Sequence, residues 1–189
     1  DAAVFVARAE KRLEELSEFG ARVEWVNQTY LTDDTDWLSA RVGTELTELG
    51  VKYAKKAARF DTVDVSPDVR RKLLLLKIGL TLPAPSRAGA ALELNEIATR
   101  LQSSYGKGKG TLDGKPIGGS DIEEQMGLVR DPKQLQEMWV SWHNNVGRPM
   151  RKDYARLVEI ANDGAKELGF RDVGALWRSG YDMPADDFA

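Results

Sequence analysis

Apolar side chains recur every three or four positions along most of the chain. The clearest stretch contains Leu38, Val42, Leu46, Leu49, Tyr53, Ala57 and Phe60. This spacing places the side chains along one face of a long amphipathic helix. Residues 94–105, 135–146 and 154–168 have the same spacing, and the alternation typical of strands is absent. The pattern predicts an all-α fold, a multi-helix array.

Residues that favour helix starts precede several of these stretches. Ser66 stands before Pro67, and Asp131 stands before Pro132. Both pairs are typical of a capping residue followed by proline in the first helical turn. Ser120 is followed by Glu123 at the spacing of a capping box, so we expect a further helix to begin there.

Four consecutive leucines, residues 73–76, interrupt the amphipathic pattern. On a helix they cover every face, so no side of this segment is polar. We therefore expect the helix that follows Pro67 to lie in the core, surrounded by other helices.

The segment 106–119 is rich in glycine and lysine and does not fit a helix. Asp113 and Gly114 stand between two short possible strands around Thr111 and Ile117. An Asp-Gly pair between strands favours a tight turn. The sequence predicts one small glycine-rich hairpin or an exposed loop.

Composition limits the classes of protein to consider. Of 189 residues, 42% are hydrophobic and 30% are charged, with a net charge of −3 and no cysteine. These values fit a folded globular protein without disulfides, and the interleaved charges argue against nucleic-acid binding. No purely apolar run comes near the roughly 20 residues of a membrane span, and residues 1–10 do not resemble a secretion signal.

The residues themselves do not form a recognisable active site. A zinc hydrolase needs several converging ligands, and the chain has one histidine, His143, between Trp142 and two asparagines. We expect His143 to pack at a helix end. The Gly-Lys run 106–110 lacks the ending of a phosphate-binding loop, which favours a solvated loop. Arg178, flanked by Trp177 and Tyr181, is expected to be partly buried and to pair with an anion or to form a structural ion pair.

Four stretches, residues 25–35, 105–109, 139–147 and 169–183, together resemble the bacterial members of the angiotensin-converting-enzyme family of zinc peptidyl-dipeptidases. They occur in the family's order and at about its spacing, so the resemblance covers essentially the whole chain. It implies an almost wholly helical protein, of which this is the N-terminal part. Residues 1–60 would form lid helices over a substrate channel, and residues 61–189 a helical body on one flank of it.

The same resemblance implies a function. The full enzymes use zinc to release C-terminal dipeptides from oligopeptides, and the zinc ligands and other catalytic residues would lie downstream of this segment. The partners would be an oligopeptide substrate and the remainder of the enzyme, in the periplasm or outside the cell. The alternative is a non-catalytic helical module of that family that binds peptides or proteins.

A few residue roles follow from the resemblance. Arg178 matches an arginine that binds a buried chloride ion, and Trp25, Thr32 and Asp36 lie where relatives contribute to the wall of the substrate channel. The animal enzymes carry a disulfide around the hairpin that matches residues 106–119, so other contacts must hold it here.

Overall fold

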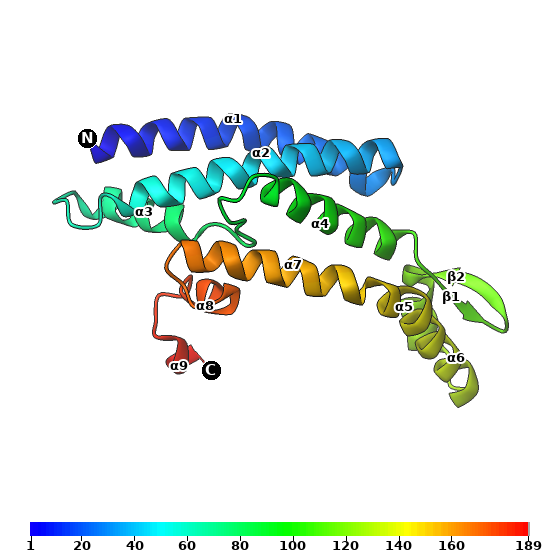
Figure 1. Cartoon of the computed structure of the whole chain (residues 1–189). Helices are drawn as coiled ribbons and strands as arrows, with labels where there is room; N and C mark the ends of the chain where they lie inside the picture. Colours follow the sequence, from blue (N-terminus) through cyan, green and yellow to red (C-terminus); the bar gives the residue numbers. More distant parts are fainter. Residues whose placement is uncertain (189) are drawn as a thin grey trace.

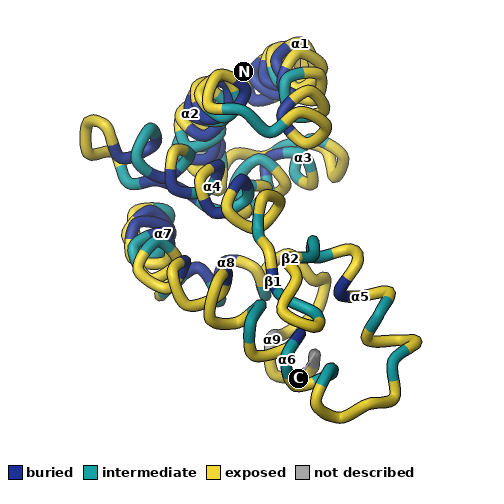
Figure 2. Tube along the Cα trace, turned by 90° about the vertical axis from the view of Figure 1, so that its right-hand side faces the viewer, coloured by how far each residue is buried: buried dark blue, intermediate teal, exposed yellow. Residues whose placement is uncertain are grey.

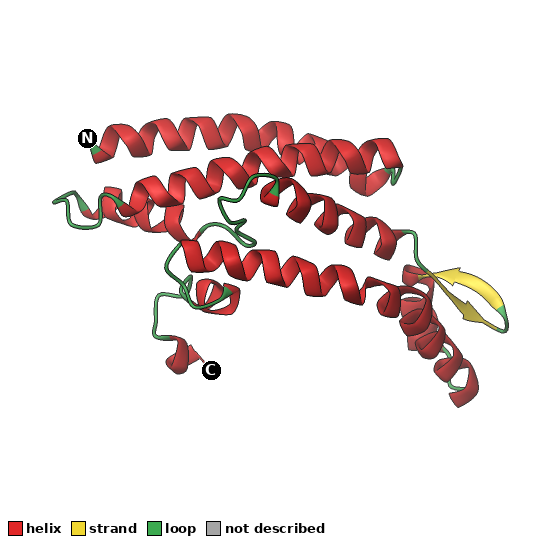
Figure 3. Ribbon diagram, in the orientation of Figure 1, coloured by secondary structure: helices red, strands yellow, loops and turns green. Residues whose placement is uncertain are grey.

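The structure, a computed structural model, describes residues 1–188 and is almost entirely helical (Figure 3). The helices are α1 (Ala2–Thr29), α2 (Asp33–Ala58), α3 (Pro67–Ile78), α4 (Ala90–Gly106), α5 (Gly119–Leu128), α6 (Pro132–Trp142), α7 (Arg148–Glu167), α8 (Val173–Arg178) and α9 (Ala185–Phe188), and the strands are β1 (Lys109–Leu112) and β2 (Lys115–Gly118). The predicted all-α helical array is confirmed.

The long helices lie in layers (Figure 1). Helices α1 and α2 form an antiparallel pair, α2 packs on α4, and α4 packs on α7 with opposite chain direction. The main core lies where α4 and α7 meet. Its buried members are Ala84, Ala90, Ala91, Leu94, Ile97, Leu101, Val146, Met150, Leu157, Ile160, Ala161, Ala165, Val173 and Leu176.

A second, smaller core joins the first turns of α1 to the end of α2 and to α3. Phe5 stacks on Phe60 with ring centroids 5.5 Å apart and meets Tyr53 edge to face at 5.9 Å. Ala57 and Leu73 are fully buried beside these rings. The hairpin of α1 and α2 is thereby fixed to α3 at one end.

Two predicted helix caps are confirmed, and the third predicted helix forms but is not capped by Ser120. The Ser66 hydroxyl accepts from the Val69 amide at 3.4 Å, and the Asp131 carboxylate accepts from Lys133 N–H at 3.0 Å. Helix α5, however, begins at Gly119, directly after β2, and the Gly118 amide donates to Asp121. The strand ends at Gly118 and turns into the helix at once, so Ser120 is already inside it.

The prediction of a surrounded core helix at residues 73–76 is wrong for the described structure. Only Leu73 is buried on α3, and Leu75 is 48% exposed. In the same way, Leu38 on α2 is exposed, whereas the smaller Ala40 and Thr44 are buried. Helix α2 contacts α1 and α4 closely on two sides, and small side chains occupy those contacts.

Helices α6 and α7 are joined by a π-helical turn, His143–Gly147, without a break in the helical path. Val146 is the buried residue of this turn and belongs to the main core. Helices α5 and α6 beyond it are mostly exposed (Figure 2). Helix α6 ends at Trp142, beside the predicted end at His143, but the helical path continues into α7 and His143 is exposed and not buried.

Candidate functional site

The turn between α1 and α2 contains a buried polar pair. The Asn27 side chain is completely buried, and its amide Nδ2 donates to Asp36 Oδ1 at 2.7 Å. Nδ2 also lies 3.4 Å from the Thr35 hydroxyl, which itself donates to the Tyr30 carbonyl at 2.7 Å. The Asp36 carboxylate is thus held from the side of α1.

Lys107 approaches the same carboxylate from the end of α4. Its Nζ lies 3.6 Å from Asp36 Oδ2, close enough for an ion pair but too far for a hydrogen bond. The Asp36 side chain is 21% exposed and the Lys107 side chain 44%. Asp36 therefore lies at the edge of solvent, between a buried amide and an exposed cation.

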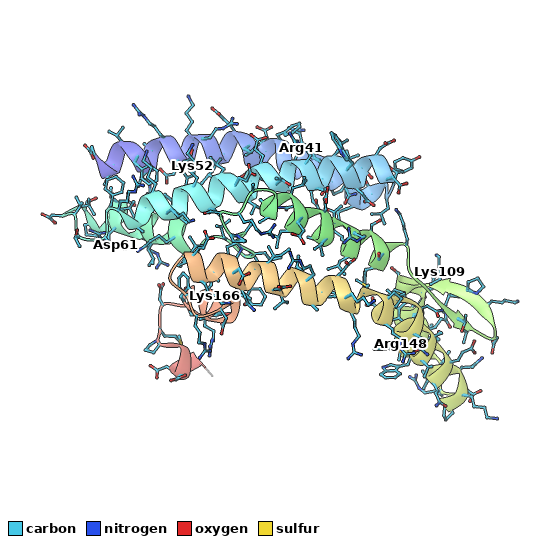
Figure 4. All side chains as sticks on the ribbon, viewed as in Figure 1. Arg41, Lys52, Asp61, Lys109, Arg148 and Lys166 are labelled. Carbon is cyan, nitrogen blue, oxygen red and sulfur yellow. The ribbon has the colours of Figure 1, made fainter. Side chains whose placement is uncertain are left out.

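Asp36 and Lys107 line a cleft of about 540 Å³ between α2 and α4. The other residues of this α2–α4 cleft are Asp33, Trp37, Ala40, Arg41, Leu92, Glu96, Thr99, Arg100, Ser103 and Ser104. Three carboxylates, three cations, hydroxyls and an exposed tryptophan give the cleft a mixed, largely charged lining. Arg41, labelled in Figure 4, lies on α2.

The other two predicted channel residues do not line this cleft. Trp25 lies on α1 with 72% of its surface exposed. Thr32 is the N-cap of α2: its hydroxyl accepts from the Thr35 amide at 3.2 Å, and its own amide donates to the Thr35 hydroxyl at 3.0 Å. The fold therefore brings Asp36, but neither Trp25 nor Thr32, to the α2–α4 cleft.

Arg178 is the last residue of α8 and is half-buried, as the sequence predicts. Its Nε donates to the Gly174 carbonyl at 3.4 Å, a local bond within α8. Among the described residues, Arg178 forms no ion pair, although its charge helps to lower the pKa of Asp172 after the Ala175 amide and the Arg171 guanidinium. Among the described residues, Nε is the guanidinium atom of Arg178 that donates a hydrogen bond.

Residues 1–188 contain no group of three or more His, Cys, Asp or Glu that could hold a metal ion. His143 is exposed and stacks on Trp139 with centroids 4.0 Å apart, and its Nδ1 lies 2.7 Å from the Trp139 carbonyl. These residues do not fit a zinc site. No helix in this part of the chain combines the length and the apolar character needed to cross a bilayer.

The hairpin is held to α6 by polar contacts. The Glu137 carboxylate accepts from the Asp113 amide at 3.0 Å and the Gly114 amide at 2.9 Å, and Ser141 Oγ accepts from the Thr111 amide at 2.8 Å. The amide of Gly114 is the largest cause of a lowered pKa of Glu137. The predicted Asp113-Gly114 turn is confirmed, with both residues at positive φ.

Comparison with known proteins gives the family. The sequence model of the Peptidase M2 family, described as angiotensin-converting enzyme, matches residues 1–189. The chain therefore belongs to the angiotensin-converting-enzyme family of peptidases.

Individual relatives agree with this family. An angiotensin-converting enzyme-like protein, Ace3, of Mus musculus is 28% identical over 88% of this chain and 23% of its own length. The angiotensin-converting enzyme of the fly Haematobia irritans exigua is 27% identical over 94% of the chain and 30% of its own length. That of Bos taurus is 26% identical over 97% of the chain and 14% of its own length. The chain spans less than a third of each of these relatives.

Two residues of the Asp36 site are missed by sequence reasoning. Asn27 belongs to an Asn-Gln-Thr glycosylation sequon, yet in the structure it is buried and not accessible to modification. Its position seven after Gly20 and eleven after Leu16, both buried on α1, is a helical signal that could have placed it on the buried face. Lys107 belongs to the glycine-lysine run, and no local signal indicates its contact with α2.

Proposed function

We propose that this chain is the N-terminal helical part of a zinc peptidyl-dipeptidase that releases C-terminal dipeptides from oligopeptides. The observation that carries the proposal is the family match along all 189 residues. The helical fold agrees with this family, and the zinc ligands would lie elsewhere in the protein. No catalytic step is assigned to the residues described here.

We further propose that residues 1–60 act as a lid and residues 61–189 as the body that flanks the substrate channel. The antiparallel pair α1 and α2 covers α4 as a layer of its own, which supports this division. Trp25, Thr32 and Asp36 lie on or near the turn between the two lid helices, and we assign them to the channel wall. A bacterial origin and a periplasmic or secreted location belong to the same proposal.

Chloride is the anion that we propose for Arg178. Its half-buried guanidinium forms no ion pair with the described residues, and an anion would balance its charge. In the longest natural protein that contains this chain, Arg178→Gln should weaken the dependence of peptidase activity on chloride more than it lowers zinc content. Arg171→Gln, an exposed neighbour, is the matched control. An unchanged chloride response in Arg178→Gln would remove Arg178 from the site.

The alternative is a non-catalytic helical module that binds peptides or proteins, and the lack of a metal-binding group among the described residues is the observation in its favour. The two are separated by measuring zinc content and dipeptide release from a blocked tripeptide with the same natural protein. Stoichiometric zinc and release of the C-terminal dipeptide support the peptidase. Peptide binding without zinc and without cleavage supports the module.

A further inference from the structure

The two oxygens of the Asp36 carboxylate have different partners. One oxygen, Oδ1, accepts the 2.7 Å bond from buried Asn27 and is fixed. The other, Oδ2, has only the 3.6 Å ion pair with Lys107. A carboxylate held on one side and loosely paired on the other can accept a second donor without rearranging.

The buried amide of Asn27 shows that this arrangement has a cost. Because its N–H groups point to Asp36 and Thr35, its oxygen Oδ1 is left buried without a hydrogen-bond partner among the described residues. Unpaired buried acceptors are rare and destabilising, and they often mark sites with a role beyond stability. The Asn27 side chain is therefore oriented so that Nδ2 bonds to Asp36, and its Oδ1 is left without a partner among the described residues.

Lys107 is suited to be displaced. It is the residue that follows α4, it stands between Gly106 and Gly108, and its side chain is 44% exposed. An exposed pair at this distance contributes little free energy, because solvent screening and the entropy of the side chain offset the attraction. Another cation can therefore take its place at low cost.

The rest of the α2–α4 cleft also favours a cation. Arg100 is already neutralised by Asp153 through bonds of 2.8 and 3.0 Å. With Lys107 displaced, the cleft lining keeps three carboxylates, those of Asp33, Asp36 and Glu96, against the guanidinium groups of Arg41 and Arg100. Trp37, 65% exposed, offers an aromatic face on which a cation can stack.

We propose that the α2–α4 cleft binds the ammonium or guanidinium group of a basic side chain, with Asp36 as its acceptor and Lys107 as the resident cation that it replaces. Asn27 is the positioning residue of Asp36. That the basic side chain belongs to an oligopeptide rests on the proposed function. The site would then select peptides with a lysine or arginine.

The test measures binding of two blocked peptides, acetyl-Ala-Lys-Ala-amide and its norleucine counterpart, to the longest natural protein that contains this chain, by calorimetry. The lysyl peptide should bind roughly tenfold more tightly, and the difference should shrink as salt is added. Asp36→Asn, which keeps an acceptor for Asn27, should weaken lysyl binding roughly tenfold. Lys107→Met should strengthen it several-fold, a gain that a misfolded protein would not give.

Asp61→Asn, which removes a carboxylate paired with Lys77 outside this cleft, is the matched control and should leave binding unchanged. Equal affinity for both peptides, or a Lys107→Met variant that binds no more tightly, would overturn the proposal. If Asp36→Asn weakens and Lys107→Met strengthens binding of the lysyl peptide, but the natural protein cleaves no peptide, the cation site stands and only the proposed peptidase function fails.

Discussion

Helix α4 packs on its two neighbours by different means. Toward α7 it presents large apolar residues, among them Leu94, Ile97 and Leu101, which interlock with Leu157 and Ile160. Toward α2 it meets small and polar residues. Gly43 lies against the side chain of Asn95, whose Nδ2 donates to the Thr47 hydroxyl at 3.0 Å.

The two interfaces differ in what they leave open. Clefts lie along the α2 side, including the α2–α4 cleft and a second of about 290 Å³ beside Gly43. Polar contacts connect this side to the rest of the molecule: Gln102 donates to Glu24 at 3.0 Å, and Lys55 donates to Glu167 at 2.7 Å. Burial of large apolar surface stabilises the α7 side, whereas the α2 side combines close approach with hydrogen bonds and leaves room for ligands.

The largest expected loss of stability comes from a substitution on the α7 side of α4. Ile160 is 1% exposed in the main core, so Ile160→Ala removes apolar contacts and leaves a cavity. The free energy of unfolding should fall by roughly 3 kcal/mol. Urea denaturation followed by circular dichroism measures it. A loss below about 1 kcal/mol would mean that burial of large apolar side chains is not what stabilises the α7 side.

A smaller effect is expected from Gly43→Ala on the α2 side. The added Cβ would lie 2.4 Å from Asn95 Oδ1, so Asn95 must shift and weaken its bond to Thr47. After the gain in helix propensity, we expect a net loss of about 1 kcal/mol. Gly127→Ala, where no atom lies within 4 Å of the new Cβ, is the control and should stabilise the protein instead. Equal effects of Gly43→Ala and Gly127→Ala on the free energy of unfolding would contradict the close approach of α2 and α4 at Gly43.

The polar connection at the other end of α2 should depend on pH. Bonds from Lys55 and then from Ser86 lower the pKa of Glu167 from 4.5 to about 2. A lowered carboxyl pKa stabilises the folded state above about pH 4.5, and that contribution is lost as the pH falls toward 2.

Because the Glu167 side chain is 36% exposed, we expect Glu167→Gln to cost only about 1 kcal/mol at pH 7. Denaturation of both proteins from pH 7 to pH 3 should show this difference shrinking at acidic pH. Asp163→Asn, at an exposed pair within α7, is the control. A difference that stays constant with pH would show that Glu167 acts by packing and not by charge.

The smallest effect on overall stability is expected outside both faces of α4, at the hairpin. Glu137→Gln replaces a carboxylate that accepts from two backbone amides, so the turn should open more often while the main core is unaffected. Amide hydrogen exchange at Asp113 and Gly114 should quicken. Exchange at Leu157 should not change, and quickening there would mean that the hairpin and core unfold together.

Local signals in the sequence predict the local structure well. Ser66 and Asp131 begin helices because their side chains bond to amides two or three residues away, and Asp113-Gly114 forms the turn because both residues adopt positive φ. The prediction fails at the exposed Leu38 and Leu75. Burial at these positions depends on which helices pack there, and periodicity does not specify a neighbour.

The candidate site is predicted in the same uneven way. Arg178 is half-buried, as its aromatic neighbours suggest, and Asp36 lies in a cleft. Asn27 and Lys107 reach Asp36 from positions 9 residues before it and 71 after it, through the packing of three helices. A contact of this kind is a product of the tertiary fold, and neither residue carries a motif that indicates it.

The π-helical turn His143–Gly147 sets the phase between α6 and α7. A π turn accommodates one residue more than the α-helical path. Deleting one residue there would rotate α6 by about 100° about its axis. The face that carries Glu137 and Ser141 would then swing away from β1, and the hairpin would lose its anchor. A deletion within residues 143–147 would therefore redirect α6 and would also disturb the main core, to which Val146 of this turn belongs.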